Sequence, residues 1–273
     1  MKVKPWNKKI VSLLLSTMSG VFGIQSFIYI FIDFSKHQKI KVAVIIINIF
    51  LLISLYIGLL IYANKKKTRK MRINNNTVNI TFGNLFQNTD GLYVINFNEY
   101  LDTQVNDKII LPSSLNGQIL LNHKDEISAI DNEIINSSNC IVNIIGENKR
   151  RVEGKKIKYR LGTCFRYNDF IGMAFSRFDD NNHAFLEAED YLYCLSYGWK
   201  QINYVYNNKN LYIPLMGTGI TRGSFFSHTP KQQLLQLMID TLRISNVKFS
   251  STITINFVIS DEFFNEISLY DLK

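Results

Sequence analysis

The sequence predicts an α/β domain with a mixed β-sheet flanked by helices, preceded by a two-helix transmembrane hairpin. Two long uncharged runs near the N-terminus indicate the hairpin. Segments with strand-like and helix-like patterns alternate after residue 73, which is typical of an α/β domain. The distribution of charge changes between these two parts, so each part is considered separately.

Two stretches within residues 1–72 have the length and composition of membrane-spanning helices. Residues 11–32 and 42–62 contain no charged side chain. A helix needs about 20 apolar residues to cross a hydrocarbon core of roughly 30 Å. The first stretch lacks the small-residue cleavage site of a signal peptide, and uncharged helices that are apolar all round are seldom core helices of a small soluble protein. We therefore expect both stretches to span a membrane.

Basic residues at the ends of the two spans predict their orientation. Four Lys residues precede the first span and six Lys or Arg residues follow the second, whereas the short loop has three Lys residues and Asp33. The positive-inside rule places both termini in the cytoplasm, so we expect a two-pass protein of the cell inner membrane. These flanks suit contact with anionic membrane lipid.

The charge of the whole chain comes from these flanks. The chain carries 31 Lys and Arg residues, of which thirteen precede Ile73, whereas 21 of its 22 Asp and Glu residues follow. The domain from 73 to 273 is therefore slightly acidic, and nucleic acid is not an expected partner. Cys140, Cys164 and Cys194 form no C-x-x-C pair and are expected to be free buried thiols, and no metal site is predicted.

Residues 73–273 are expected to form one cytoplasmic domain with alternating strands and helices. A polar linker at 64–76 leads to the first strand. We predict strands at 78–82, 91–97, 140–145, 158–165, 170–178, 211–215 and 252–259, and helices at 115–121, 127–135, 184–199 and 231–244. Polar residues cluster directly after the strand at 91–97, where α/β proteins place ligand contacts: Asn98, Glu99 and Asp102.

The sharpest local pattern is the glycine-rich turn that follows the strand at 211–215. It reads Pro-Leu-Met-Gly-Thr-Gly-Ile-Thr-Arg-Gly from Pro214 to Gly223. Glycine permits positive φ and close approach of backbone amides to an anion, while Thr218, Thr221 and Arg222 add possible phosphate donors. The turn fits neither a Walker A loop nor G-x-G-x-x-G. From these residues alone, it is either a phosphate loop or a simple connection.

Three segments together resemble the macro domains, a family that binds ADP-ribose and its derivatives. That family usually has Gly-Asp-Ile after its first strand, Asn-Ala-Ala-Asn after the next, and a late Gly-Thr-Gly-type phosphate loop. The corresponding segments here are Gly83-Asn-Leu85, Asn96-Phe-Asn98 and Gly217-Thr-Gly219 with Gly223. The resemblance implies a macro-domain-like mixed sheet.

The likeness is closer to one branch, the type II Thoeris anti-phage effectors of the ThsA family. In these effectors a macro-like domain follows two transmembrane helices. Val94–Thr103, Ala174–Asp179 and Pro214–Thr221 carry the similarity, which extends to the hairpin. It implies a partner TIR-domain protein whose diffusible product, histidine-ADP-ribose, binds the domain. The chain would then form a homo-oligomer and disrupt the membrane, causing abortive infection, with no resident cofactor.

The resemblance also implies the positions of ligand contacts. Asn84 and Leu85 would face adenine and Asn98 the distal ribose. The diphosphate would contact the residues of the turn: Gly217, Thr218, Gly219, Ile220 and Gly223. Glu99 and Asp102 are further candidates, because a carboxylate suits an imidazole or an amine, although both are equally typical of solvated loop charges. Thr221 and Arg222 complete the predicted site.

Two departures from the macro-domain pattern affect the predicted activity. Asn84 replaces the adenine-binding Asp, and Ser114–Gln118 replace the glycine run of hydrolytic members. The first departure affects recognition of the base, and the second argues against hydrolysis, so we predict a binding protein without catalytic residues. One alternative is a membrane-bound ADP-ribosyl hydrolase with Glu99, Asp102 or Asp179 as general base. Another alternative is a membrane tether whose domain binds only proteins.

Overall fold

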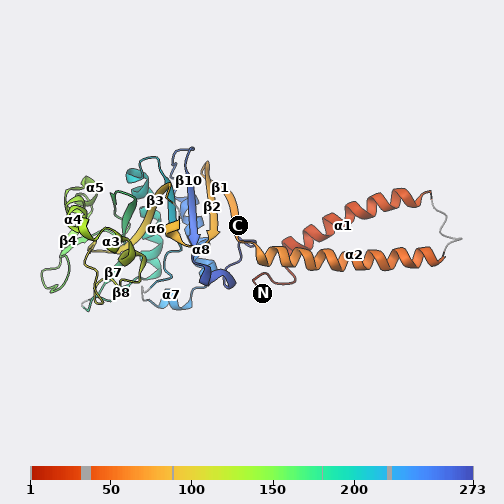
Figure 1. Ribbon diagram of the computed structural model, residues 1–273, viewed down its shortest axis with the longest axis horizontal. Coiled ribbons are helices and arrows are strands. Elements are labelled where there is room, and N and C mark those ends of the chain that lie inside the picture. The colour runs from red at the N-terminus through yellow and green to blue at the C-terminus, as the bar shows by residue number, and fades with distance from the viewer. Residues whose placement is uncertain (1, 32–37, 88, 180, 220–222, 273) are drawn as a thin grey trace. The chain divides into compact units, whose positions relative to one another are not determined.

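The structure is a computed structural model that describes residues 2–31, 38–87, 89–179, 181–219 and 223–272 (Figure 1). The chain divides into two compact units. The first unit contains residues up to Lys67 together with Ser268–Leu272, and the second contains Thr68–Ile267. The last residues of the chain therefore group with the N-terminal helices.

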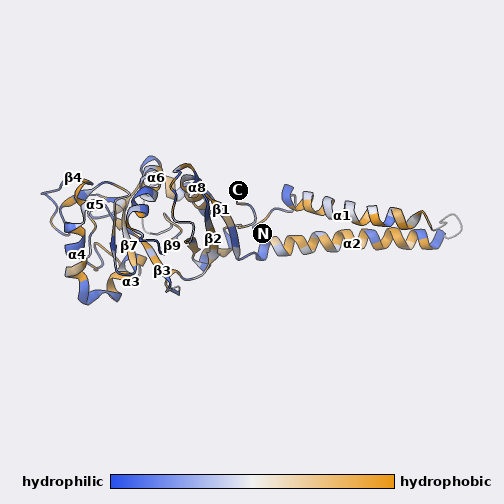
Figure 2. Ribbon diagram, turned by 90° about the horizontal axis from the view of Figure 1, so that it is seen from above, coloured by the Kyte–Doolittle hydropathy of each residue, from blue (hydrophilic) through white to orange (hydrophobic). Residues whose placement is uncertain are grey.

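The first unit is a hairpin of the helices α1, Lys8–Tyr29, and α2, Gln38–Lys65 (Figure 1). Both are long enough and apolar enough to cross a membrane (Figure 2), and their apolar side chains are largely exposed. Asn7 caps α1 by accepting hydrogen bonds from the amides of Lys9 and Ile10. Between the helices, Gln25 Nε2 donates to Asn48 Oδ1 at 3.0 Å, a polar link of the kind that joins helices in apolar surroundings.

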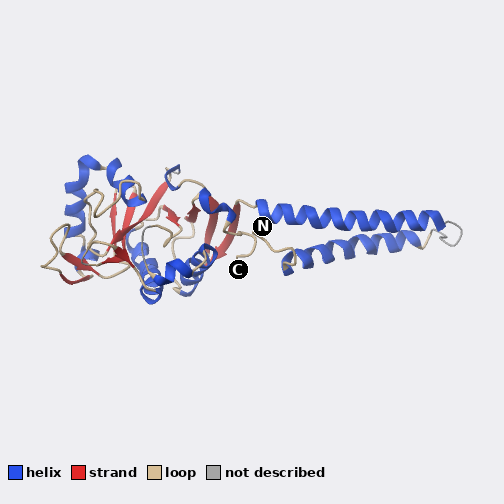
Figure 3. Cartoon of the chain, turned by 90° about the horizontal axis from the view of Figure 1, so that it is seen from below, coloured by secondary structure: helices blue, strands red, loops and turns tan. Residues whose placement is uncertain are grey.

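The second unit is a mixed sheet with helices on both faces (Figure 3). Within the described residues, eight strands form this sheet in the order β1-β2-β10-β9-β3-β7-β6, with β8 paired to β7. The strands of this sheet are β1 Thr68–Ile73, β2 Asn76–Phe82, β3 Gly91–Asn98, β6 Cys164–Tyr167, β7 Phe170–Phe178, β8 Ala184–Phe185, β9 Asn210–Pro214 and β10 Thr254–Ile259. The run β2-β10-β9-β3-β7 is parallel, and β1, β6 and β8 pair antiparallel.

The helices pack on opposite faces of β7 because its side chains alternate. Ala174 contacts the cluster that contains Ile119 of α3 and Ile130 of α4, whereas the Phe175 ring meets Tyr191 of α6 edge to face. The helices of this unit are α3 Leu115–Asn122, α4 Ile127–Asn136, α5 Ser138–Ile141, α6 Ala188–Val205, α7 Ser224–His228 and α8 Lys231–Ile244, with 3-10 turns η1 Leu85–Gln87, η2 Lys124–Glu126 and η3 Asp261–Asn265. A separate ribbon pairs β4, Ile144–Glu147, with β5, Ile157–Tyr159.

The mixed sheet, the flanking helices and the two apolar helices confirm the predicted fold class. Four local predictions were wrong. The helix predicted at 184–199 begins only at Ala188, because Ala184–Phe185 form strand β8. The residues assigned to a linker include strand β1, which is an edge strand rich in basic side chains, a composition that suits an unpaired sheet edge. The predicted strand at 140–145 contains α5 and the start of β4, and the one at 158–165 divides into parts of β5 and β6.

The free cysteines confirm the expectation of buried thiols. Cys140, Cys164 and Cys194 are each buried. Burial raises the pKa of the Cys140 thiol to about 11, and burial also holds the pKa of Cys164 far above the usual value for a thiol. These thiols are therefore protonated near neutral pH and unreactive.

Gly172 in β7 is required by the aromatic core that surrounds it. A Cβ at this position would lie 2.2 Å from Phe165 Cε1 and 3.0 Å from Phe97 Cε2. Both rings are buried, so neither has room to move away. We predict that Gly172→Ala lowers the free energy of unfolding by about 1–3 kcal/mol through overpacking.

Urea unfolding of the full chain in detergent tests this prediction, because Trp199 is buried and its fluorescence reports on the domain. Gly146→Ala is the matched control, since a Cβ there meets no atom within 4 Å. Equal unfolding midpoints for the two variants would contradict the packing argument.

Candidate functional site

A cavity of about 680 Å³ opens where the parallel strands of the sheet end. This size is within the usual range for small-molecule sites. Its lining comes from the residues at or after the ends of β2, β3, β7, β9 and β10, together with the start of α3. Ligands of open α/β sheets bind at this edge, because the loops that follow parallel strands meet there. The topology therefore marks this cavity as the candidate site.

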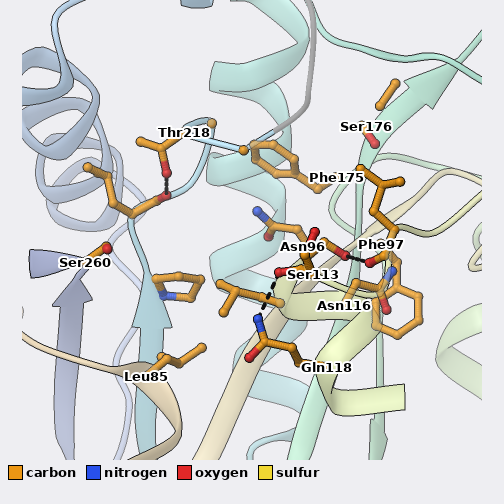
Figure 4. Close-up of a pocket in the computed structure, with 18 of the residues that line it drawn as sticks. Leu85, Asn96, Phe97, Ser113, Asn116, Gln118, Phe175, Ser176, Thr218 and Ser260 are labelled. Atoms are coloured by element: carbon orange, nitrogen blue, oxygen red, sulfur yellow. Dashed lines mark hydrogen bonds between the residues drawn. The ribbon is translucent and has the colours of Figure 1, made fainter. Parts of the chain in front are cut away.

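Two ends of the cavity differ in the segments that form them (Figure 4). One end is formed by Gly83–Leu85 and by Ser260–Phe263, and the other by Asn96–Asn98, Ser113–Asn116 and the end of β7. The glycine turn contributes Gly217, Thr218 and Gly219. The three segments that carry the macro-domain resemblance thus line a single cavity.

The glycine turn has a conformation and contacts that require glycine at Gly217. This residue has φ of 88°, and a Cβ there would lie 2.4 Å from Phe226 Cε1. Thr218 Oγ1 donates to the carbonyl of Leu215 at 2.9 Å, which closes the turn. Tyr191 donates its hydroxyl to the carbonyl of Met216 at 3.2 Å, and burial raises the pKa of Tyr191, so this donor keeps its proton.

Gly219 differs from Gly217, because space is open around it. A Cβ at Gly219 meets no atom within 4 Å, and the residue lines the cavity. Backbone amides in a turn of this kind converge to form a concave anion site. The turn can therefore place its amides against an anionic ligand, while the side-chain contacts described above keep the turn in position.

Asn84 lies exposed beside the buried Leu85 at the first end of the cavity. Its Oδ1 accepts a hydrogen bond from the Phe86 amide at 3.0 Å and thereby shapes η1. Gly83 donates its amide to the carbonyl of Ile259 at 2.9 Å, which holds the ends of β2 and β10 together. The carbonyl oxygen of the Asn84 side chain is thus occupied by η1.

At the second end, two amide side chains line the cavity with unpaired oxygens. The Oδ1 atoms of Asn96 and Asn116 are buried and have no hydrogen-bond partner among the described residues. A buried acceptor without a donor costs about 1–3 kcal/mol, so such atoms point to a ligand or a water molecule. Ser114 caps α3 by accepting from the Gly117 amide at 3.0 Å, which confirms the predicted helix start and positions Asn116.

Asn98 lines the cavity, but its side chain is hydrogen-bonded within its own loop. Its Nδ2 donates to Asp102 Oδ2 at 2.9 Å, and its Oδ1 accepts from the Tyr100 amide at 3.0 Å. Leu101, which precedes Asp102, adopts a φ of 50°, which is uncommon for a residue other than glycine. Such conformations persist where surrounding contacts fix the backbone, often at functional sites. Asn98 therefore fixes the loop that follows β3.

Asp102 is buried in an ion pair beside the cavity. Its carboxylate accepts from Arg151 Nη1 at 3.1 Å and from Nη2 at 2.6 Å, and from the Lys155 amide at 2.7 Å. The Arg151 guanidinium also lies 3.9 Å from the centre of the Tyr100 ring. These partners hold the Asp102 carboxylate away from the cavity lining.

Glu99 is also buried and paired. Its Oε1 accepts from Lys158 Nζ at 3.1 Å and from the Phe178 amide at 3.3 Å, while Arg177 lies 3.7 Å from Oε2. Arg177 in turn donates two hydrogen bonds to Asp190, which lower the pKa of Asp190. The structure thus gives both predicted loop carboxylates internal partners, and neither is a lining residue.

Half of the predicted contact residues come together at the cavity. Asn84, Leu85, Asn98, Gly217, Thr218 and Gly219 line it. Gly223 has a φ of 149°, and a Cβ there would lie 2.4 Å from the carbonyl oxygen of Leu186, but the residue does not line the cavity. Ile220, Thr221 and Arg222 lie outside the described residues. The predicted contacts did not include the lining residues Asn96, Asn116 and Phe175, although each lies in a segment that the family resemblance had marked. Ser260–Phe263 also line the cavity, and no sequence pattern indicated this segment.

Metal binding has no candidate cluster in the described part of the chain. No group of three or more His, Cys, Asp or Glu side chains there is placed to hold an ion. Asp179 accepts hydrogen bonds from the amides of Asn181 and His183, and it does not line the cavity.

Comparisons with known proteins agree with this geometry. The model of the family described as "Thoeris protein ThsA, Macro domain" matches residues 78–260. The chain belongs to the Thoeris ThsA family. The Thoeris protein ThsA of Bacillus amyloliquefaciens (strain Y2) is 32% identical over 277 residues, and the match covers 99% of this chain and 89% of that protein. Family membership therefore includes the hairpin as well as the macro domain.

Solved structures similar to this ThsA-family chain include the Oceanobacillus iheyensis macrodomain. Its structure with ADP has a TM-score of 0.46 at 13% identity, covering 72% of this chain and 90% of that chain. A mutant of the same macrodomain with ADPR has a TM-score of 0.45 at 13% identity, covering 72% and 92%.

The Arg151–Asp102 pair should be essential for the stability of the loop beside the site. We predict that Arg151→Met lowers the free energy of unfolding by about 3–5 kcal/mol, because it leaves a buried carboxylate without its cation. Denaturant unfolding of the full chain measures this loss.

Lys108→Met provides the control, since it removes an exposed pair with Glu153 in which Lys108 is 70% exposed. An exposed pair of this kind contributes little to stability, because solvent screens it. The interpretation fails if the two substitutions destabilise the chain equally.

Proposed function

We propose that this ThsA-family chain is a membrane-anchored effector of anti-phage defence whose macro domain binds an ADP-ribose derivative. The proposed ligand is histidine-ADP-ribose, made from NAD by a partner TIR-domain protein. Ligand binding leads the chain to oligomerise in the inner membrane, with both termini cytoplasmic, and to disrupt that membrane. The infected cell then stops growing or dies before phage spread.

The observation that carries this proposal is the meeting of three separate motif segments at one cavity. Gly83–Leu85, Asn96–Asn98 and Gly217–Gly219 are far apart in the sequence and line the same space. An ADP-ribose derivative has a base, a diphosphate and a distal ribose joined in one line. The resemblance assigns the base to Gly83–Leu85, the diphosphate to Gly217–Gly219 and the distal ribose to Asn96–Asn98, and the two ends of the cavity suit that arrangement.

The charges at the cavity favour backbone recognition of the diphosphate. Among the described lining residues the charged ones are Asp261 and Glu262, and there is no Lys, Arg or His, so we infer that turn amides supply the positive potential. Unpaired oxygens of Asn96 and Asn116 suit hydroxyl or N–H donors at the distal end of the ligand.

Binding without hydrolysis is supported by the positions of the candidate bases. Glu99 and Asp102 are buried in ion pairs, Asp179 is bonded to its own loop, and none of the three lines the cavity. A general base must reach the water that it activates. We therefore propose a sensor and not a hydrolase.

The membrane step of the proposal involves the exposed face of α1. Ser19, Gly20 and Gly23 lie on this helix, and a Cβ at either glycine meets no atom within 4 Å. Small residues allow close approach of transmembrane helices, so this face suits contact between hairpins.

An ADP-ribose derivative should increase the mass of the detergent-solubilised particle, because the proposed function requires the chain to oligomerise on ligand binding. An unchanged mass at saturating ligand would argue against assembly.

The phosphate-binding role of the turn predicts the effect of Gly219→Glu. Open space around Gly219 lets the chain fold with this side chain, while a carboxylate in the turn repels a diphosphate. We expect the affinity for ADP-ribose to fall by at least about 100-fold in calorimetric titration of the full chain in detergent, because a like charge at an anion site costs several kcal/mol.

Gly146→Glu is the matched control, because it adds the same charge at an open position outside the cavity lining. It should bind ADP-ribose like the wild type. If the wild type binds neither ADP-ribose nor its histidine conjugate, the proposed function is wrong. If Gly219→Glu leaves the function of the chain unchanged, the alternative of a membrane tether whose domain binds only proteins is favoured.

A further inference from the structure

The last residues of the chain hold the base of the helical hairpin. The segment Ser268–Leu272, here named the tail clamp, groups with α1 and α2 in the first unit. Asn7, the N-cap of α1, donates its Nδ2 to Asp271 Oδ1. Lys9 Nζ donates to the carbonyls of Tyr270 and Leu272 at 3.3 and 3.2 Å. The tail clamp therefore fixes the first turn of α1.

Apolar contacts extend the tail clamp to α2. Tyr270 packs against a cluster of Val3, Ile10 and Ala63, which also includes three α2 residues: Tyr56, Leu59 and Leu60. Val3 donates its amide to Asn64 Oδ1 at 3.1 Å, and Tyr56 donates to the carbonyl of Pro5 at 2.8 Å. One short segment thus joins the start of α1 to the end of α2.

The same stretch of chain begins at the cavity. Ser260–Phe263, which include the first turn of η3, line the cavity. Phe263 donates its amide to Ser260, and the carbonyl of Phe263 accepts from Glu266 at 2.9 Å and from Ile267 at 3.2 Å. Ile267 is fully buried. Only four residues separate Phe263 from Ser268, the first residue of the tail clamp, and two of them are hydrogen-bonded to Phe263.

We propose that the tail clamp couples occupancy of the cavity to the hairpin. A ligand that presses against Ser260–Phe263 displaces η3, and the connected tail clamp leaves Asn7 and Lys9, which frees the base of the two helices. This inference rests on the proposed ligand-binding function and adds the route by which binding reaches the membrane helices. Coupling of this kind is reciprocal, so a weaker clamp favours ligand binding.

Asp271→Ala tests the reciprocal effect in the full chain in detergent. It removes the acceptor of Asn7 without touching the cavity lining. The calorimetric dissociation constant for ADP-ribose should fall by about fivefold or more, the lower range of measured allosteric couplings. Asp240→Ala, which removes an exposed pair with Arg243 on α8, is the matched control and should leave the constant unchanged.

Release of the clamp has a separate readout in thiol reactivity. Leu272 is fully buried, so Leu272→Cys should react slowly with a maleimide, and saturating ADP-ribose should increase that rate several-fold. Val142→Cys, at a position 74% exposed, should react fast with or without ADP-ribose. The native cysteines are buried and contribute little background.

The outcomes separate this inference from the proposed function. If ADP-ribose binds and both readouts change as described, the coupling is supported. If ADP-ribose binds but either the affinity of Asp271→Ala or the reactivity of Leu272→Cys stays unchanged, the coupling is overturned and the sensor function stands. If the wild type binds no ADP-ribose, the sensor function fails and the inference fails with it.

Discussion

The parallel pairing of five neighbouring strands determines where the site of this protein lies. Because β2, β10, β9, β3 and β7 run in one direction, their following loops meet at one edge of the sheet. A register shift at the end of β3, where Asn98 pairs with Ser176 after Phe97 pairs with Ala174, places extra β7 residues at that edge. The glycine turn and the asparagine loop thereby share one cavity.

Two ion pairs with buried carboxylates stabilise the loop beside the second end of this cavity, and none of their residues lines the cavity. The Asp102–Arg151 and Glu99–Lys158 pairs hold the loop after β3 in one conformation. A loop fixed in this way loses little entropy when a ligand binds. The cavity is lined by Gly217–Gly219 of the glycine turn and by the unpaired oxygens of Asn96 and Asn116, so its described lining offers hydrogen-bonding groups and no cationic side chain.

Local sequence patterns predicted the elements that have strong periodicity or special chemistry. The helix at 231–244, the buried strand at 170–178 and the glycine turn all follow from such patterns. The strand β1 escaped prediction because its basic side chains resemble a linker, and short apolar runs near Cys140 fit a helix or a strand equally. Asn116 and the tail clamp acquire their contacts from tertiary structure, which no local pattern records.

Hydrogen exchange of the full chain with and without ADP-ribose tests the central claim most directly. Ligand binding at one convergent site should slow exchange at the separate segments that line it, among them 83–85, 96–98, 113–116, 217–219 and 260–263. Slower exchange shared by these segments is the predicted result. Unchanged exchange at saturating ligand, or protection confined to residues outside these segments, would contradict the account.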